Sequence, residues 1–220
     1  MSGEFVAAIE DVLELYAEAD DPKRPRVNFD ECSVELHADA RPPLPPAPGR
    51  PGLYDCEYVR AGTANLFVVV DPTAGRRHVT VTERRTKADF AERMRRPCDE
   101  WHPDAEVIRV VPDNLNTHTV GALYEAFAPA EARRPAAKLE FHYTPKHASR
   151  LNMAELELSV LARQCLRRRL PNAATLAAEV AAWEEARNRD GVTIKWCFRV
   201  ADARKKLHRA YPKQTPAADH

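Results

Sequence analysis

The chain has 220 residues, of which 44% are hydrophobic, enough to bury the core of one large domain or two small ones. Its 33 Lys and Arg residues balance its 33 Asp and Glu residues, which excludes a strongly basic, histone-like protein and an acidic disordered one. The sequence shows neither a membrane-length apolar run nor a basic secretion signal, and its five cysteines lack the spacing of a disulfide framework or a zinc site. We therefore expect a cytoplasmic protein with reduced thiols and no membrane partner.

The first elements expected are one helix and three strands. Residues 1–22 carry apolar side chains at helical spacing and predict an amphipathic helix that prolines end. The segment Val27 to Leu36 has apolar residues at odd and even positions, as expected for a strand covered on both faces. Asn65 to Val70 and His78 to Glu83 flank a short turn, so they predict a hairpin.

A proline-rich insert separates the first strand from this hairpin. Six of the chain's 18 prolines lie between Arg41 and Pro51. Proline lacks the backbone N–H group that helices and sheets use. We therefore expect residues 41–58 to form an extended loop that projects from the sheet and makes few core contacts.

Helices and strands alternate in the second half of the chain. Thr86 begins a capping pattern and predicts a helix. Val107 to Val111 predicts a short buried strand, which is followed by a helix that Thr119 caps and by a strand from Leu139 to Tyr143. Beyond Leu151 the pattern predicts helices to the end of the ordered chain.

This element order is that of a ribonuclease-H-like fold of the α/β class, a mixed five-stranded sheet with helices on both faces. The expected catalytic domain covers residues 23–170. A helical extension over residues 171–213 and a disordered tail over residues 214–220 are expected to follow it.

Three acidic residues stand where such a sheet would bring them together. Asp30 lies within the first strand, Asp113 follows the fourth strand, and Glu155 lies one turn into the helix after the fifth strand. A carboxylate among apolar residues is costly unless a cation neutralises it, and Mg²⁺ prefers such oxygen ligands. Taken singly, an Asx turn at Asp113 and a solvated helix face at Glu155 are the more ordinary interpretations.

Several motifs resemble, in chain order, the catalytic domain of bacterial insertion-sequence transposases of the mariner-like DDE superfamily. The matching segments are FDE at residues 29–31, AGTANLF at 61–67, TERRTKADFA at 82–91, DNLNTH at 113–118 and FHYTPKHASRLNMAELELS at 141–159. The resemblance implies that Asp30, Asp113 and Glu155 are a catalytic triad that holds two Mg²⁺ or Mn²⁺ ions. It implies DNA as the partner, at transposon ends and target, and a homodimer in the active complex.

Two other acidic residues compete for these roles. Glu157 lies two residues after Glu155, about 200° around a helix, so both cannot face the same ions. We choose Glu155 because it occupies the Glu of the family's Leu-Asn-x-x-Glu pattern. Glu31 points to the opposite side of the strand from Asp30, and we expect it to have a supporting or structural role.

Supporting residues are expected around the triad. His118 and His147 flank the site in this interpretation, where either would orient a water or contact a phosphate, although ordinary surface histidines are the more frequent case. Asn114 is placed with them and is equally compatible with the turn after the fourth strand.

The C-terminal part is basic, with 13 Lys and Arg against 5 Asp and Glu between Leu158 and Lys213. We expect Arg167, Arg168 and Arg169, together with Lys146, to contact DNA phosphates in a salt-dependent manner that is blind to sequence. The alternative is an ordinary solvated helix face.

The chain also departs from the family pattern. Family members carry an N-terminal helix-turn-helix region, whereas here a single helix precedes the first strand. Pro112, Ala148, Arg150 and Arg77 also differ from the usual residues. Two hypotheses follow: a metal-dependent polynucleotidyl transferase, or a truncated, inactive remnant that only binds nucleic acid or pairs with intact transposase.

Overall fold

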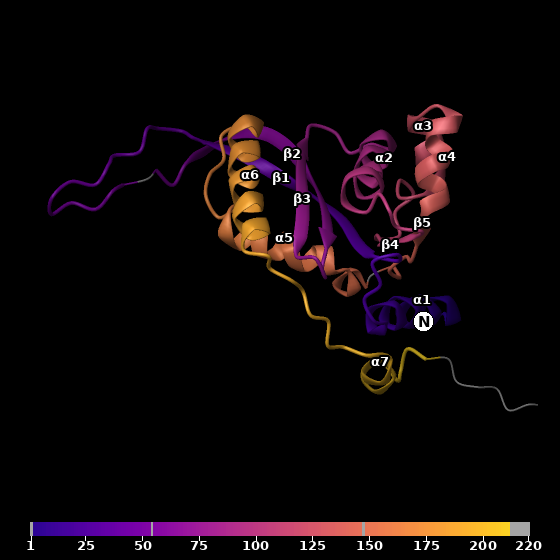
Figure 1. Ribbon diagram of the computed structural model, residues 1–220. Helices are drawn as coiled ribbons and strands as arrows, with labels where there is room; N and C mark the ends of the chain where they lie inside the picture. The colour runs from indigo at the N-terminus through magenta and orange to yellow at the C-terminus, as the bar shows by residue number, and fades with distance from the viewer. Residues whose placement is uncertain (1, 54, 147, 212–220) are drawn as a thin grey trace, which may run out of the picture.

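The computed structural model describes residues 2–53, 55–146 and 148–211. A five-stranded sheet in the order β3-β2-β1-β4-β5 lies between helices on both faces (Figure 1). The strands are β1 (Arg26–Asp39), β2 (Tyr58–Asp71), β3 (Arg76–Thr82), β4 (Ile108–Val111) and β5 (Leu139–Phe141). The α-helices are α1 (Gly3–Ala17), α2 (Lys87–Arg96), α3 (Val120–Ala126), α4 (Pro129–Lys138), α5 (Met153–Gln164), α6 (Ala173–Arg189) and α7 (Val200–Lys206).

The sheet is mixed because its connections differ in length. A short turn joins β2 to β3, and β1, β2 and β3 pair antiparallel. Helices connect β3 to β4 and β4 to β5, and β1, β4 and β5 pair parallel. Parallel pairing needs such long crossovers. As a result, β4 runs in the same direction as β1 and ends opposite Asn28, while β1 continues to Asp39.

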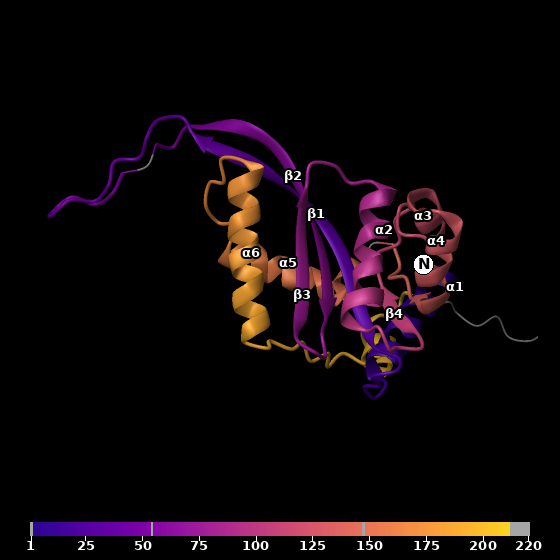
Figure 2. The same cartoon turned by 45° about the horizontal axis from the view of Figure 1, so that its top comes forward.

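The two faces of the sheet bury separate cores. On one face, Phe29 and Phe67 pack with Phe90 of α2 in a core that also includes α3 and α4. On the other face, Val68 packs with side chains of α5 and α6, among them Leu161. Figure 2 shows α2 and α6 on opposite sides of the strands. The alternation of side chains along each strand therefore decides which helix a residue meets.

Helix α1 packs beneath the sheet at its β4 end. Val12 and Tyr16 contact Val111 of β4 and Met153 of α5 within one buried cluster. Ile9 and Leu13 pack against α7. The first helix is therefore part of the folded domain, next to the start of α5.

The outer edge of β3 is covered by α6. The backbone N–H of Val79 donates to Oε2 of Glu184 at 2.7 Å, and that of Arg77 donates to Oδ1 of Asn188 at 2.9 Å. Nδ2 of Asn188 donates in return to the carbonyl of Arg77 at 2.8 Å. Side chains one helical turn apart thus bond the groups that an edge strand leaves open.

The strands β1 and β2 continue past the sheet as a two-stranded arm, residues 34–64, that carries the proline-rich insert at its tip. Figure 1 shows this arm extending far from the body of the molecule. Isolated bridges join Leu44 to Leu53 and Ala47 to Arg50 within the insert. Leu44 and Leu53 are 62% and 59% exposed.

The region after α6 differs from the prediction of continuous helices. Residues 190–199 form an extended strap between α6 and α7, and the N–H of Ile194 donates to the carbonyl of Pro72 at 3.0 Å. Ile194 and Trp196 are partly buried, whereas Lys195 and Cys197 are exposed. Gly75 lies beneath the strap with φ +64, where an added Cβ would come within 2.7 Å of the Gly191 carbonyl oxygen.

Element boundaries also differ in places. The helix expected from Leu151 to Arg169 spans only Met153–Gln164, and α4 was not expected. Pro129 occupies the first turn of α4, a position that tolerates proline, while Pro135 inside the helix weakens the sequence signal. The predicted tail, residues 214–220, lies outside the described residues. Within the described ranges, none of the helices has both the length and the apolar character needed to cross a membrane.

Candidate active site

Asp30 lies in the middle of the sheet and faces α5. It pairs with Val68 in the antiparallel ladder, and the Val68 side chain belongs to the core beneath α5 and α6. Directly opposed residues point to the same side of a sheet, so Asp30 points toward α5. Asp30 is only 9% exposed, although it is a carboxylate.

Asp113 reaches the same place from the neighbouring strand. Asn28 of β1 pairs with Val111 of β4 in parallel register. A step of two residues from each member of this pair leads to Asp30 and Asp113. The chain leaves β4 after Val111, so Asp113 lies at the end of that strand, and its charge acts on Asp30 of the neighbouring strand.

Glu155 is the third residue of α5, whose start is tied to β1. Asn152 caps this helix, because its Oδ1 accepts the N–H of Ala154 at 3.0 Å. Nδ2 of Asn152 donates to the carbonyl of Phe29 at 2.6 Å, one residue before Asp30. Oε2 of Glu155 is buried and has no hydrogen-bond partner in the part of the chain that the structure describes.

The three carboxylates act on each other electrostatically. Burial raises the pKa of Asp30 to about 7, and the charges of Asp113, Glu155 and Glu31 contribute to this increase. A hydrogen bond from the N–H of Glu31, at 2.8 Å, opposes it in part. Asp113 and Glu155 therefore lie near enough to Asp30 for their charges to act on it, and these three carboxylates are called the acidic cluster below.

His118 is buried between two of the acidic residues rather than lying on the surface. Its Nε2 is 2.8 Å from Oε2 of Glu31, and its Nδ1 forms an ion pair with Asp113. Its ring stacks on Phe90, with centroids 4.8 Å apart. Burial alone lowers the pKa of His118, but the hydrogen bonds and charges of Asp113 and Glu31 raise it to about 9. His118 thus links Glu31 to Asp113 and limits the orientation of the Asp113 carboxylate.

Glu157, the rival of Glu155, is engaged elsewhere. Its carboxylate accepts two hydrogen bonds from Arg187 of α6, at 3.0 and 2.7 Å, and lies 3.3 Å from Nε of Arg77. The Glu157 and Arg77 side chains are 2% and 0% exposed. Of the two glutamates, the geometry leaves Glu155 facing the aspartates.

A hollow of about 440 Å³ lies beside the acidic cluster and is lined by Glu31, Arg85, Asn114, Leu115, Asn116, Thr117 and Lys146. A second hollow, of about 250 Å³, includes Asp113, Asn114 and Lys146. The structure thus places Asn114 and Lys146 next to Asp113. Arg85, which sequence reasoning did not single out, pairs with Glu31 at 3.4 Å. His147 lies outside the described residues.

Comparison with known proteins identifies the family. The model of the DDE superfamily endonuclease domain matches residues 25–177. The chain belongs to the DDE superfamily endonucleases. No curated protein matches its sequence.

Solved structures share the fold of this DDE superfamily endonuclease. The Mos1 mariner paired-end complex with Mn matches with a TM-score of 0.56 and 15% identity, over 87% of this chain and 59% of that chain. The Mos1 strand transfer complex matches with a TM-score of 0.56 and 15% identity, over 86% and 56%. This chain therefore spans less than two thirds of the length of these structures. The predicted ribonuclease-H-like fold is confirmed.

The donor set of this endonuclease suits a hard divalent cation. Carboxylate oxygens are the ligands that Mg²⁺ and Mn²⁺ prefer, and Oε2 of Glu155 is a buried acceptor without a partner among the described residues. The described part of the chain holds no group of three His, Cys, Asp or Glu side chains already gathered closely enough to bind a metal ion. Asp113 instead faces His118.

Arg167, Arg168 and Arg169, which were predicted to contact DNA, have different surroundings in the structure. Arg169 binds the base of the arm, donating to Oδ1 of Asp39 at 2.7 Å and to the carbonyl of Asp55 at 2.6 Å. Arg168 pairs with Glu179 of α6, and Arg167 is exposed. All three follow α5, whose 12 residues span about 18 Å from the Glu155 end. The geometry does not favour Arg169 as a phosphate contact.

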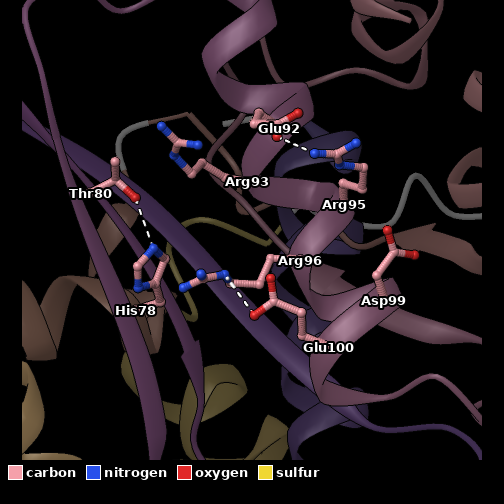
Figure 3. A pocket seen from close by; sticks show the side chains of 8 residues that line it. All are labelled: His78, Thr80, Glu92, Arg93, Arg95, Arg96, Asp99 and Glu100. Carbon is pink, nitrogen blue, oxygen red and sulfur yellow. Dashed lines mark hydrogen bonds and ion pairs between the residues drawn. The ribbon is translucent and has the colours of Figure 1, made fainter.

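Another hollow, of about 240 Å³, lies between β3 and α2 (Figure 3). It opens on the α2 side of the sheet, whereas Asp30 faces α5. Figure 3 shows Arg95 directed to Glu92 and Arg96 to Glu100, and both pairs are ion pairs. Because these charges neutralise each other, this hollow does not extend the acidic site.

Proposed function

We propose that this chain is the catalytic domain of a DDE transposase, which cuts DNA at the ends of a mobile element and joins those ends to a target. The proposal is supported by the placement of Asp30 in β1, Asp113 just after β4 and Glu155 in the first turn of α5, in a chain of this family. Burial raises the pKa of Asp30, and the charges of Asp113 and Glu155 add to this increase. Such a cluster calls for bound cations.

Asp30, Asp113 and Glu155 would hold two Mg²⁺ or Mn²⁺ ions. When bound, such a pair activates a water or a 3′-hydroxyl and stabilises the leaving oxygen of a phosphodiester. The proposal is supported by two similar folds, the Mos1 paired-end complexes with Mn and with Mg. His118 supports it from the protein side, because the ion pair with Asp113 limits the orientations of that carboxylate.

The DNA partner would approach through the hollow that Arg85 and Lys146 line. Both cations lie at the rim of an acidic site, where they can bind the phosphates that flank the reacting one. Asn114 and Lys146 also line a hollow together with Asp113. Arg167 is exposed beyond the C-terminal end of α5 and would contact the DNA backbone away from the acidic cluster.

We further propose that the active form is a homodimer in which the arm contacts a second copy of the chain. The arm places Leu44, Leu53, Tyr58 and Val59 in solvent, with exposed fractions between 45% and 62%. Exposed apolar side chains gathered on one projecting segment are typical of a surface that binds a partner. The similar structures are complexes that pair two transposon ends, which favours two copies.

A nicking assay on supercoiled plasmid DNA tests the function. The wild-type chain should convert supercoiled to open-circular DNA in Mg²⁺ or Mn²⁺, whereas Asp113→Asn should not, and both should bind duplex DNA with the same salt dependence. If neither protein nicks while both bind, the chain is the inactive remnant. Equal nicking by both proteins would assign the activity to another site or to a contaminant.

A further inference from the structure

A buried hydrogen-bond network joins α1, β1 and the start of α5 behind the acidic cluster. The hydroxyl of Tyr16 donates to the carbonyl of Leu151 at 3.0 Å and accepts a hydrogen bond from Nδ2 of Asn28. Nδ2 of Asn28 also lies 3.3 Å from Oδ1 of Asn152. Both asparagines are 0% exposed and Tyr16 is 6% exposed. Polar groups at this depth are costly unless they are bonded, so their presence calls for a reason.

Asn152 connects the two elements that carry the carboxylates. One end of its side-chain amide bonds the carbonyl of Phe29, adjacent to Asp30, and the other end caps α5 at Ala154, adjacent to Glu155. The amide is planar and short, so the two bonds together hold the start of α5 at a set distance from β1. An ionised Asp would cap the helix but has no donor for the strand, and the single hydroxyl of Ser is too short to bond both groups.

Tyr16 and Asn28 support the link that Asn152 makes between β1 and α5. Tyr16 fixes the turn before α5 through the Leu151 carbonyl, and its ring packs against Trp196 with centroids 5.2 Å apart. Asn28 bonds both Tyr16 and Asn152 through one Nδ2 group. Hydrogen bonds of Tyr16, Asn28 and Asn152 therefore connect α1 to β1 and to the start of α5. None of these three residues is acidic.

We propose that Tyr16, Asn28 and Asn152 are positioning residues that set the separation between Glu155 and Asp30, and thereby the affinity of the acidic site for divalent metal ions. The inference rests on the proposed function. These residues act through Glu155 and touch no substrate. A merely structural role would lower the stability of the fold and leave the metal affinity of the folded protein unchanged.

The decisive variant is Tyr16→Phe, which removes one hydroxyl and keeps the ring. The metal-free chain is titrated with Mn²⁺, and free Mn²⁺ is measured by electron paramagnetic resonance. We expect about tenfold weaker binding, the lower end of what second-layer partners of metal ligands contribute. Tyr211→Phe is the matched control, because its hydroxyl bonds Glu10 of α1 at 2.9 Å without reaching α5. The control should bind Mn²⁺ as the wild type does.

Asn152→Ser provides a second, independent variant. Serine retains the helix cap but cannot reach the Phe29 carbonyl, so Mn²⁺ binding should weaken by a similar factor. Thermal unfolding without metal establishes that each variant is folded at the temperature of the titration. In the nicking assay, both variants should need about tenfold more Mg²⁺ for half-maximal rate.

The outcomes separate this proposal from the proposed function. If Tyr16→Phe and Asn152→Ser are folded and bind Mn²⁺ with wild-type affinity, the positioning role is overturned and the function stands. If the wild type does not bind Mn²⁺, or binds it just as tightly after Asp30→Asn, the proposed function fails and the positioning role fails with it.

Discussion

Glu157 accepts two hydrogen bonds from Arg187, at 3.0 and 2.7 Å, and so turns away from Asp30 although it lies only two residues from Glu155. Two neighbouring glutamates on one helix thus have opposite environments. One belongs to a buried ion pair with α6, and the other leaves an oxygen without a hydrogen-bond partner among the described residues.

This division predicts opposite effects of two conservative changes. Glu155→Gln should abolish metal-dependent nicking with little loss of stability, because it removes one of three mutually repelling charges. Glu157→Gln should lower the free energy of unfolding by about 3 kcal/mol, since it leaves Arg187 and Arg77 buried without their partner. Urea denaturation and the nicking assay measure the two effects. Loss of nicking in a well-folded Glu157→Gln, with activity retained in Glu155→Gln, would reverse the assignment.

Metal exchange provides a second prediction. Nicking should stop on addition of EDTA, return with Mg²⁺ or Mn²⁺, and fail with Ca²⁺, which takes more ligands at longer distances. DNA binding measured by fluorescence anisotropy should continue in all four conditions. Activity in EDTA would contradict a metal-dependent mechanism.

The metal-free protein should show a distinctive dependence of stability on pH. The pKa of Asp30 is about 7 in the folded chain, against an ordinary value of 3.8. Between these values the folded state binds a proton that the unfolded state releases, so this residue increases stability as pH falls from about 7 to about 4. The contribution should reach a few kcal/mol.

Asp30→Asn is the control for this effect, because it should remove the increase in stability as pH falls from 7 to 4. His118 gives a separate signature, since its pKa is raised to about 9. Its stabilising contribution is complete below pH 6.5 and is lost as pH rises through 9, and this loss should persist in Asp30→Asn. Thermal melts across the pH range distinguish the two. Parallel curves for wild type and Asp30→Asn would refute the Asp30 assignment.

The exposed leucines of the arm predict a change in self-association. Replacing Leu44 and Leu53 by Ser should weaken dimerisation and leave the melting temperature nearly unchanged, because both side chains lie in solvent. Leu156→Ser on α5 is a matched control, since this leucine is 43% exposed and lies outside the arm. Sedimentation equilibrium measures the association. A large loss of thermal stability in the arm variant would mean that the insert is packed structure.

Much of the fold was predictable because its signals are local. Buried strands such as Val107 to Val111 stand out as short apolar runs, and the capping box of Thr86 and Asp89 is present as expected. The strap after α6 was not predicted although its apolar residues alternate. The helical patterns on both sides of it suggested that this whole region was helical. Period 2 in Val192, Ile194 and Trp196 was the available signal.

The site was predictable in its members but not in its contacts. Asp30 was conspicuous as a carboxylate among apolar neighbours. His118 was expected beside the triad, but its contact with Glu31 was not foreseen because the two residues are 87 positions apart in the chain. The network of Tyr16, Asn28 and Asn152 likewise depends on tertiary packing, since Tyr16 and Leu151 are 135 residues apart. Patterns in a short window carry no information on such pairs.

The closed edge at β3 restricts how copies of this chain can assemble. Glu184 and Asn188 already bond the N–H and carbonyl groups of Arg77 and the N–H group of Val79, so a strand from another molecule cannot pair with this part of β3. A continuous sheet through two copies across this edge would first require α6 to detach. The molecule can therefore carry a long two-stranded projection into solvent while its central sheet stays protected at β3 from edge-to-edge pairing.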